Sequence, residues 1–171
     1  MRIEGDHKMK YAICQTKLVA GQPEANYQII EQWTHAVMSA EQKPDILVLP
    51  EMWTTAYTLP DLEQKAEHRL AITLPFLQRL ATQYDVHFIG GSVANKKDGG
   101  IYNTALVVSR QGELVYEYDK AHLVPMLNEP AFLQEGESLS QVFELDGVKM
   151  GVIICYDLRF PELARSLALE G

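Results

Sequence analysis

The stretch that decides the fold is GVIICYDLRFPELARSLALEG, residues 151–171. Its apolar run from Gly151 to Cys155 predicts a buried strand that ends on a cysteine. Pro161 suits the first turn of a helix, so the residues that follow it predict a helix. The stretch is therefore predicted to form a strand-to-helix turn, with its cysteine at the point where the strand ends.

Buried strands and amphipathic helices alternate through the first part of the chain. Short apolar or β-rich runs predict the strands, and apolar side chains at helical spacing predict the helices. The predicted strands span 10–16, 45–51 and 86–93, and the predicted helices begin at Pro23 and span 62–83. Two hairpins follow, one in 101–117 and one joined by the Asp-Gly pair at 146–147, while 121–138 is irregular. This order predicts a mixed α/β architecture in which helices pack on a sheet.

The chain of 171 residues has the length of one domain, and its composition, 47% hydrophobic and 22% charged, is that of a globular protein. Its formal net charge of -8 argues against nucleic acid as a partner. No apolar run approaches the roughly 20 residues of a membrane span, and the charged N-terminus does not resemble a signal peptide. Two cysteines without C-x-x-C spacing indicate a reducing compartment. We therefore expect a cytoplasmic protein, with residues 1–8 as an extension and 9–171 as the domain.

Polar side chains follow three of the predicted strands. ILVLPE ends on Glu51, VYEYDK ends on Lys120 and GVIIC ends on Cys155. Ligands bind at the carboxyl ends of strands in open α/β sheets, so these side chains are expected to converge on one pocket. There Glu51 could take the thiol proton of Cys155 and later activate water, and Lys120 could stabilise an oxyanion. The backbone N–H of Tyr156 is a natural second oxyanion donor.

Each of these side chains also has a structural interpretation. Cysteine is among the most buried residue types, and we assign Cys14, which has no polar companions, to the core. Glu51 could lie in the first turn of a helix and Lys120 in a solvated loop, and structural roles outnumber catalytic ones. The occurrence of all three at strand ends favours a site. The histidines show no metal-ligand spacing and no phosphate-binding glycine loop is present, so neither a zinc site nor a nucleotide is indicated.

Three segments closely resemble the signature segments of the nitrilase superfamily of carbon–nitrogen hydrolases: VLPEMWTTAY, YDKAHLVP and CYDLRFPELAR. The resemblance runs from Met9 to the last residue, and GSVANKKDGGIYNTALVVSRQGELVYEYDKAHL is similar to the ω-amidase-type branch. It implies an α-β-β-α sandwich that cleaves the amide bond of a small ω-amide such as 2-oxoglutaramate. The implied reaction passes through a cysteine thioester, releases ammonia and needs no cofactor or metal.

The resemblance also implies roles for individual residues. Glu51 would be the general base, Lys120 the oxyanion-stabilising lysine and Cys155 the nucleophile. MLNEPAF places Glu129 as a second glutamate that orients Lys120 and the attacking water, and Glu135 is a weaker alternative.

Arg159, in CYDLRFPE, has two interpretations. It could bind a substrate carboxylate, or it could pair with Asp157 or Glu162 and hold the turn. The structural role is slightly favoured.

The sequence resembles only the N-terminal part of the family's sandwich. We therefore expect an incomplete fold with open strand edges and uncovered apolar surface, which favours a homodimer or a higher homo-oligomer. On this interpretation Cys155 lies near the end because the chain stops early. Two functions stay open: an amidase acting on a small-molecule amide, or a truncated family member that folds and self-associates without turnover. An acyl transferase or a nitrile hydrolase of the same superfamily is a third.

Overall fold

The computed structural model describes residues 8–171, so almost all of the predicted extension, residues 1–8, lies outside the described part. The strands are β1 (Tyr11–Ile13), β2 (Ile46–Val48), β3 (Glu67–His68), β4 (His87–Lys97), β5 (Gly100–Val108), β6 (Leu114–Asp119), β7 (Phe143–Leu145) and β8 (Val148–Met150). The α-helices are α1 (Pro23–Met38), α2 (Leu62–Lys65), α3 (Thr73–Tyr84) and α4 (Pro161–Leu169). The predicted α/β class is confirmed.

Two sheets form the centre of the structure. The larger runs in the order β1-β2-β4-β5-β6, with β3 paired to β4, and the smaller consists of β7 and β8. β2 pairs in parallel with β1 on one side and with β4 on the other. β5 pairs antiparallel with β4 and with β6. Both predicted hairpins are present, and the second turns through Asp146 and Gly147, whose positive φ angles of 47° and 78° suit a tight hairpin turn.

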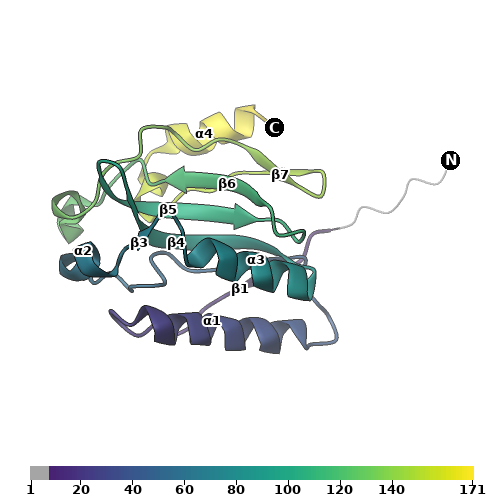
Figure 1. Ribbon diagram of the computed structural model, residues 1–171. Coiled ribbons are helices and arrows are strands. Elements are labelled where there is room, and N and C mark those ends of the chain that lie inside the picture. The colour runs from purple at the N-terminus through teal and green to yellow at the C-terminus, as the bar shows by residue number, and fades with distance from the viewer. Residues whose placement is uncertain (1–7) are drawn as a thin grey trace.

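The central strands of the larger sheet, β2, β4 and β5, are buried on both faces. Leu47 and Phe88 pack on one face with Ile30 of α1 and Leu77 of α3, and these helices lie together on that side in Figure 1. Ile46 of β2 and Val107 of β5 belong to a second cluster, in which they pack with Phe143 and Leu145 of the β7–β8 hairpin. Figure 1 shows α4 on the same side as this hairpin. Strands covered on both faces are continuous apolar runs, which is the pattern that the sequence shows.

The single helix predicted over 62–83 is wrong. The segment forms α2, the short strand β3 and α3 instead, and Arg69 between β3 and α3 has a left-handed backbone with φ 50°. The carboxylate of Glu67 accepts hydrogen bonds from the N–H groups of Ile72 (2.8 Å) and Thr73 (2.9 Å), which satisfies donors at the start of α3. Leucines continue at helical spacing across the break, so periodicity does not reveal it.

The strand predicted over 151–155 is also wrong. Residues 151–154 form no regular secondary structure and pair with no strand in the described part of the chain. Side chains take part in two of its hydrogen bonds: the Val152 carbonyl accepts one from Ser140 Oγ (2.5 Å), and the Ile154 N–H donates one to Asp157 (3.0 Å). The Ile154 carbonyl accepts a third from the Asp157 N–H (3.0 Å). The predicted helix after Pro161 is present as α4. None of the helices in residues 8–171 is both long and apolar enough to cross a membrane.

Candidate active site

An irregularity in β4 positions Glu51. The pairing of β4 with β5 shifts register between Ile89 and Ser92, and Gly91 in this bulge has φ 61°. A Cβ at position 91 would overlap the Pro50 carbonyl oxygen, so the chain before Glu51 lies directly against the bulge. The Ser92 N–H donates to that carbonyl (3.1 Å). The close approach of the two backbones therefore requires a glycine at position 91, and it fixes the position of the backbone just before Glu51.

Lys120 follows β6 and is completely buried. Its Nζ lies 3.1 Å from Oε1 of Glu51 and 3.1 Å from both carboxylate oxygens of Glu129. Burial alone would lower the pKa of Lys120, but the two carboxylates outweigh burial and raise it. Lys120 is therefore a buried ammonium held between two carboxylates.

Glu129 lies in the irregular segment and begins a short 3-10 helix, Glu129–Ala131. Its side chain is fully buried, and Oε2 also accepts a hydrogen bond from the Val124 N–H (2.7 Å). Glu135, the alternative second glutamate, is exposed to solvent. The structure therefore places Glu129, and not Glu135, beside Lys120.

Two further residues contact the Glu51 carboxylate, and sequence reasoning missed both. The Tyr57 hydroxyl lies 2.6 Å from Glu51 Oε1 and 2.7 Å from Glu129 Oε1. Asn103 Nδ2 donates to Glu51 Oε1 (2.9 Å) from the buried interior of β5. The only signal for Tyr57 was its place in VLPEMWTTAY, and nothing in the sequence distinguished Asn103. Burial, followed by the bonds to both carboxylates, raises the pKa of Tyr57 and keeps the phenol protonated.

Cys155 begins a 3-10 helix, Cys155–Arg159, and has a left-handed backbone with φ 47°. Such a conformation costs a non-glycine residue about 1–2 kcal/mol and is found where the surrounding structure enforces it. Cys155 and Glu51 line one pocket of about 150 Å³ whose other walls are mainly apolar. Burial and the nearby Glu51 carboxylate raise the pKa of the Cys155 thiol, whereas Lys120 opposes that rise. A base and a cation therefore both act on this thiol.

Asp157 holds the turn that carries Cys155. Its buried carboxylate accepts hydrogen bonds from the Tyr118 hydroxyl (2.8 Å), the His122 N–H (3.0 Å) and the Ile154 N–H (3.0 Å). It also lies 2.8 Å from Nδ1 of His122, whose ring stacks on Phe160 with a centroid separation of 3.6 Å. Asp157 thus ties the turn to the segment that follows Lys120.

The two remaining predicted site residues lie in the same 3-10 helix. The Tyr156 N–H belongs to its first turn, where donors have no partner within the helix. Arg159 is exposed, and within residues 8–171 it forms no ion pair with Asp157 or Glu162. The pairing favoured from the sequence is therefore not formed, because Asp157 is engaged by His122 and Tyr118.

The second cysteine lies in the core, as expected. Cys14 is 4% exposed, and burial raises the pKa of its thiol to about 11. Among the described residues, no group of three or more His, Cys, Asp or Glu side chains is arranged to hold a metal ion.

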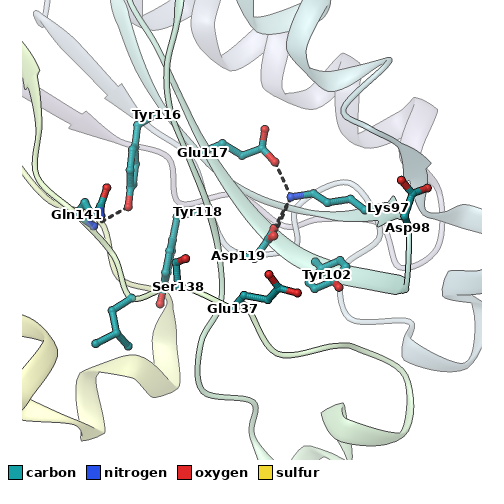
Figure 2. Close-up of a pocket in the computed structure, with 11 residues that line it drawn as sticks. Lys97, Asp98, Tyr102, Tyr116, Glu117, Tyr118, Asp119, Glu137, Ser138 and Gln141 are labelled. Carbon is teal, nitrogen blue, oxygen red and sulfur yellow. Dashed lines mark hydrogen bonds and ion pairs between the residues drawn. The ribbon is translucent and has the colours of Figure 1, made fainter.

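Figure 2 shows a second pocket, of about 460 Å³, along β6. Lys97 lies in it with its Nζ 2.5 Å from Glu117 and 2.8 Å from Asp119, so its charge is already paired. Burial would lower the pKa of Lys97, but these two carboxylates raise it. Neither Glu51 nor Cys155 lines this pocket, and its ion pairs hold β4 against β6.

The site therefore combines a buried ammonium held by two glutamate side chains with a thiol on a left-handed turn. The sequence matches the carbon–nitrogen hydrolase family over residues 10–171, and the chain belongs to that family. It is 45% identical over 164 residues to "Hydrolase in agr operon" of Staphylococcus aureus, covering 95% of this chain and 62% of that protein. It is 37% identical over 165 residues to "2-oxoglutaramate amidase" of Bacillus subtilis, with coverage of 95% and 62%.

The fold agrees with that assignment. The crystal structure of Saccharomyces cerevisiae Nit3, a member of the nitrilase superfamily, matches with a TM-score of 0.85 at 27% identity, covering 95% of this chain and 60% of that one. The predicted nitrilase-type fold is therefore confirmed. The chain spans about three-fifths of the length of the relatives it matches.

Proposed function

We propose that this chain hydrolyses the amide bond of a small ω-amide such as 2-oxoglutaramate, through a thioester on Cys155, and releases ammonia. One observation carries the proposal. The Cys155 thiol shares a small pocket with the Glu51 carboxylate, and that carboxylate is hydrogen-bonded to the buried Lys120 ammonium. Nucleophile, base and cation are the groups that amide cleavage by a thiol requires.

Acylation is the first half of the proposed reaction. Glu51 takes the thiol proton, and the thiolate of Cys155 attacks the amide carbonyl carbon. Negative charge then moves to the carbonyl oxygen, where Lys120 and the Tyr156 N–H stabilise it. The C–N bond breaks, Glu51 returns its proton to the leaving nitrogen, and ammonia departs from the thioester.

In deacylation, the second half, Glu51 acts on water in place of the thiol. Glu51 takes a proton from water, and the hydroxide attacks the thioester carbonyl. The C–S bond then breaks, and the thiolate recovers its proton as the carboxylic acid leaves. Glu129 supports both halves because it holds Lys120 and borders the position of the attacking water. No step needs a metal or a cofactor.

The small pocket and the exposed Arg159 support the proposed substrate class. A pocket of about 150 Å³ with apolar walls suits a short acyl chain. Arg159 lies in the same 3-10 helix as Cys155, so it is the proposed partner of a carboxylate at the far end of the substrate. The name of the Bacillus subtilis relative points to such a substrate, a dicarboxylic monoamide. Arg159→Ala should then raise KM for 2-oxoglutaramate at least tenfold and leave KM for a neutral aliphatic amide unchanged.

Ammonia release tests the proposed function directly. The purified chain should release ammonia from 2-oxoglutaramate, Cys155→Ala should abolish the release, and Cys14→Ala should keep it. Release that survives Cys155→Ala would overturn the proposal.

A second candidate function is a family member that folds and self-associates without turnover. The exposed apolar side chains of the edge strand β1 favour it, since Tyr11 is 49% and Ile13 69% exposed. Size-exclusion chromatography with light scattering should then show a homodimer or a higher homo-oligomer, and no ammonia should appear. A monomer that releases ammonia would exclude this candidate.

A further inference from the structure

Three donors converge on one oxygen of the Glu51 carboxylate. Oε1 accepts hydrogen bonds from the Tyr57 hydroxyl (2.6 Å), Asn103 Nδ2 (2.9 Å) and Lys120 Nζ (3.1 Å). No described N–H or hydroxyl group donates to Oε2. A carboxylate has about four lone-pair positions on its two oxygens, so three donors saturate Oε1 and leave Oε2 as the oxygen that can take a proton.

Asn103 differs from the other two donors because it is not shared with Glu129. The Tyr57 hydroxyl lies 2.7 Å from Glu129 Oε1, and Lys120 Nζ lies 3.1 Å from both oxygens of Glu129. Asn103 Nδ2, in contrast, has Glu51 Oε1 as its acceptor and no other within residues 8–171. Asn103 therefore holds Glu51 independently of the second glutamate.

The amide of Asn103 is oriented at a cost. Asn103 is completely buried, and its Oδ1 has no hydrogen-bond partner among the described residues. Leaving a buried acceptor unpaired is unfavourable, and such a group requires an explanation. If the amide were turned over, Oδ1 would face Glu51 Oε1, and neither oxygen would have a hydrogen to share. The amide therefore keeps the orientation that gives Glu51 a donor, although its own oxygen stays unsatisfied.

A second buried asparagine shows the opposite arrangement. Asn95, in the neighbouring strand β4, is also completely buried. Its Oδ1 accepts a hydrogen bond from the Leu70 N–H (3.1 Å), and its Nδ2 has no partner among the described residues. Asn95 thus satisfies a backbone donor between β3 and α3, which is a structural role, whereas Asn103 donates to a side chain of the site.

We propose that Asn103 is a positioning residue that holds Glu51 by Oε1, so that Oε2 is the oxygen that takes the thiol proton of Cys155. The inference rests on the proposed function, because it assigns the proton transfer of that reaction to one oxygen. Strand β5 suits this role because it pairs with β4 on one side and with β6 on the other. The Asn103 carbonyl also accepts the Lys120 N–H (2.9 Å), so one residue of a rigid strand holds both the base and the backbone of the cation.

The Cys155 thiol responds to the position of Glu51. Burial is the largest influence that raises its pKa, and the Glu51 carboxylate raises the pKa further through its charge and through a hydrogen bond. Lys120 opposes this rise, and Glu129 adds to it. Because three donors occupy Oε1, the contact with the thiol falls to Oε2. A Glu51 side chain released by Asn103 would lie less firmly beside the thiol, and the pKa of Cys155 would fall.

The experiment is the pH dependence of Cys155 alkylation by iodoacetamide, followed by mass spectrometry of the Cys155 peptide. Asn103→Leu removes the donor to Glu51 together with the unpaired oxygen. Its alkylation midpoint should lie about half a pH unit below that of the parent, because Glu51 then acts less strongly on the thiol. In a Glu51→Gln background the same substitution should not move the midpoint, because no carboxylate charge remains to be positioned.

Asn95→Leu is the matched control, since it alters a buried asparagine of the neighbouring strand that does not contact the site. It should leave the alkylation midpoint unchanged and lower the midpoint of urea denaturation, because the Leu70 N–H loses its acceptor. Asn103→Leu should lower the urea midpoint less, because Glu51 Oε1 keeps two donors. An unchanged alkylation midpoint in Asn103→Leu would overturn the proposal, and so would an equal fall in the Glu51→Gln background. If Asn103→Leu does not fold, Asn103→Ala also removes the donor and should show the same fall.

Turnover separates this inference from the proposed function. In a parent that releases ammonia, Asn103→Leu should lower kcat by about tenfold and leave KM within about twofold, because the base is misplaced while binding is retained. An unchanged kcat would overturn the proposal. A parent that releases no ammonia would overturn the proposed function, and the alkylation midpoints, which need no turnover, would then decide whether Asn103 positions Glu51.

Discussion

The two halves of the site are held in different ways. Lys120 and Glu129 are completely buried, and hydrogen bonds from three segments of the chain fix them against Glu51. Cys155 is exposed, the segment before it pairs with no strand in residues 8–171, and its turn depends on Asp157. The charged cluster is therefore preformed by the larger sheet and the segment after it, whereas the position of Cys155 depends on one carboxylate.

Lys120→Met should have the largest effect on stability. It leaves Glu51 and Glu129 without their counter-charge, and loss of one partner from a buried ion pair costs about 3–5 kcal/mol in the free energy of unfolding. Urea denaturation measures this change. Lys96→Met is the control, because Lys96 pairs with Glu63 at the surface and its loss should cost less than about 1 kcal/mol. Equal losses in the two variants would contradict a buried charged cluster.

The pH dependence of the same variant sharpens the test. The folded-state pKa of Lys120 is raised, so the stability that its charge contributes is complete below the ordinary lysine pKa of about 10.4 and is lost as pH rises through the folded value. The difference in stability between the parent and Lys120→Met should stay constant from neutral pH to about pH 9 and shrink above it. A difference that shrinks on acidification alone would show that Lys120 is not the group responsible.

Asp157→Ala should have the next largest effect. It removes the acceptor of hydrogen bonds from Tyr118, His122 and Ile154 and leaves these donors unsatisfied, at a cost of about 3 kcal/mol. Chemical denaturation measures the loss, and Glu162→Ala on the exposed face of α4 is the control. The midpoint of Cys155 alkylation should move down towards that of an ordinary thiol as its turn loosens, because burial and Glu51 are what raise the pKa of Cys155. Unchanged stability would contradict the view that Asp157 holds the nucleophile.

Gly91→Ala should disturb the preformed half. Its positive φ costs about 1 kcal/mol with an alanine, and the overlap of the new Cβ with the Pro50 carbonyl should add about 1–2 kcal/mol and displace Glu51. Gly147→Ala is the matched control, because Gly147 also has a positive φ but a Cβ there would contact nothing within 4 Å. Thermal unfolding and ammonia release compare the two variants. Equal effects would show that the contact between position 91 and Pro50 does not matter.

Tyr118→Phe should have the smallest effect. It removes the hydroxyl that donates to Asp157 (2.8 Å) and accepts from the Ala121 N–H (3.1 Å), while three of the four hydrogen-bonding contacts of Asp157 remain. The expected loss is about 1–1.5 kcal/mol in urea denaturation. A loss as large as that of Asp157→Ala would mean that the whole turn depends on this single bond.

The same contrast explains what could be predicted from the sequence. The larger sheet was predictable because its strands are continuous apolar runs, and Glu51 and Lys120 were expected to lie together because both follow strands of that sheet. The structure brings them together with Glu129, while their catalytic roles stay predictions. The strand at 151–155 was wrong because an apolar run indicates burial but not whether a partner strand lies beside it. The break in 62–83 was missed because it depends on Glu67 and on a backbone conformation that spacing does not record.

The remaining parts of the site depend on contacts between distant segments. Asn103 reaches Glu51 only after the fold brings β5 and the Glu51 turn together, and Tyr57 reaches Glu129 only through the tertiary fold. The role of Asp157 was missed because its partners Tyr118 and His122 lie in β6 and just after it, far away in the sequence. Residue type alone could not assign these three side chains, since each is also common in ordinary structural positions.

The central claim is that the preformed cluster acts on Cys155 to form a thioester. The most direct measurement is the mass of the chain quenched in acid soon after mixing with 2-oxoglutaramate, followed by digestion to locate the adduct. We predict that the acyl group is attached to the peptide containing Cys155, that it disappears as substrate is consumed, and that it is absent from Cys155→Ala. Ammonia release without any acyl adduct, or an adduct on Cys14, would contradict this account.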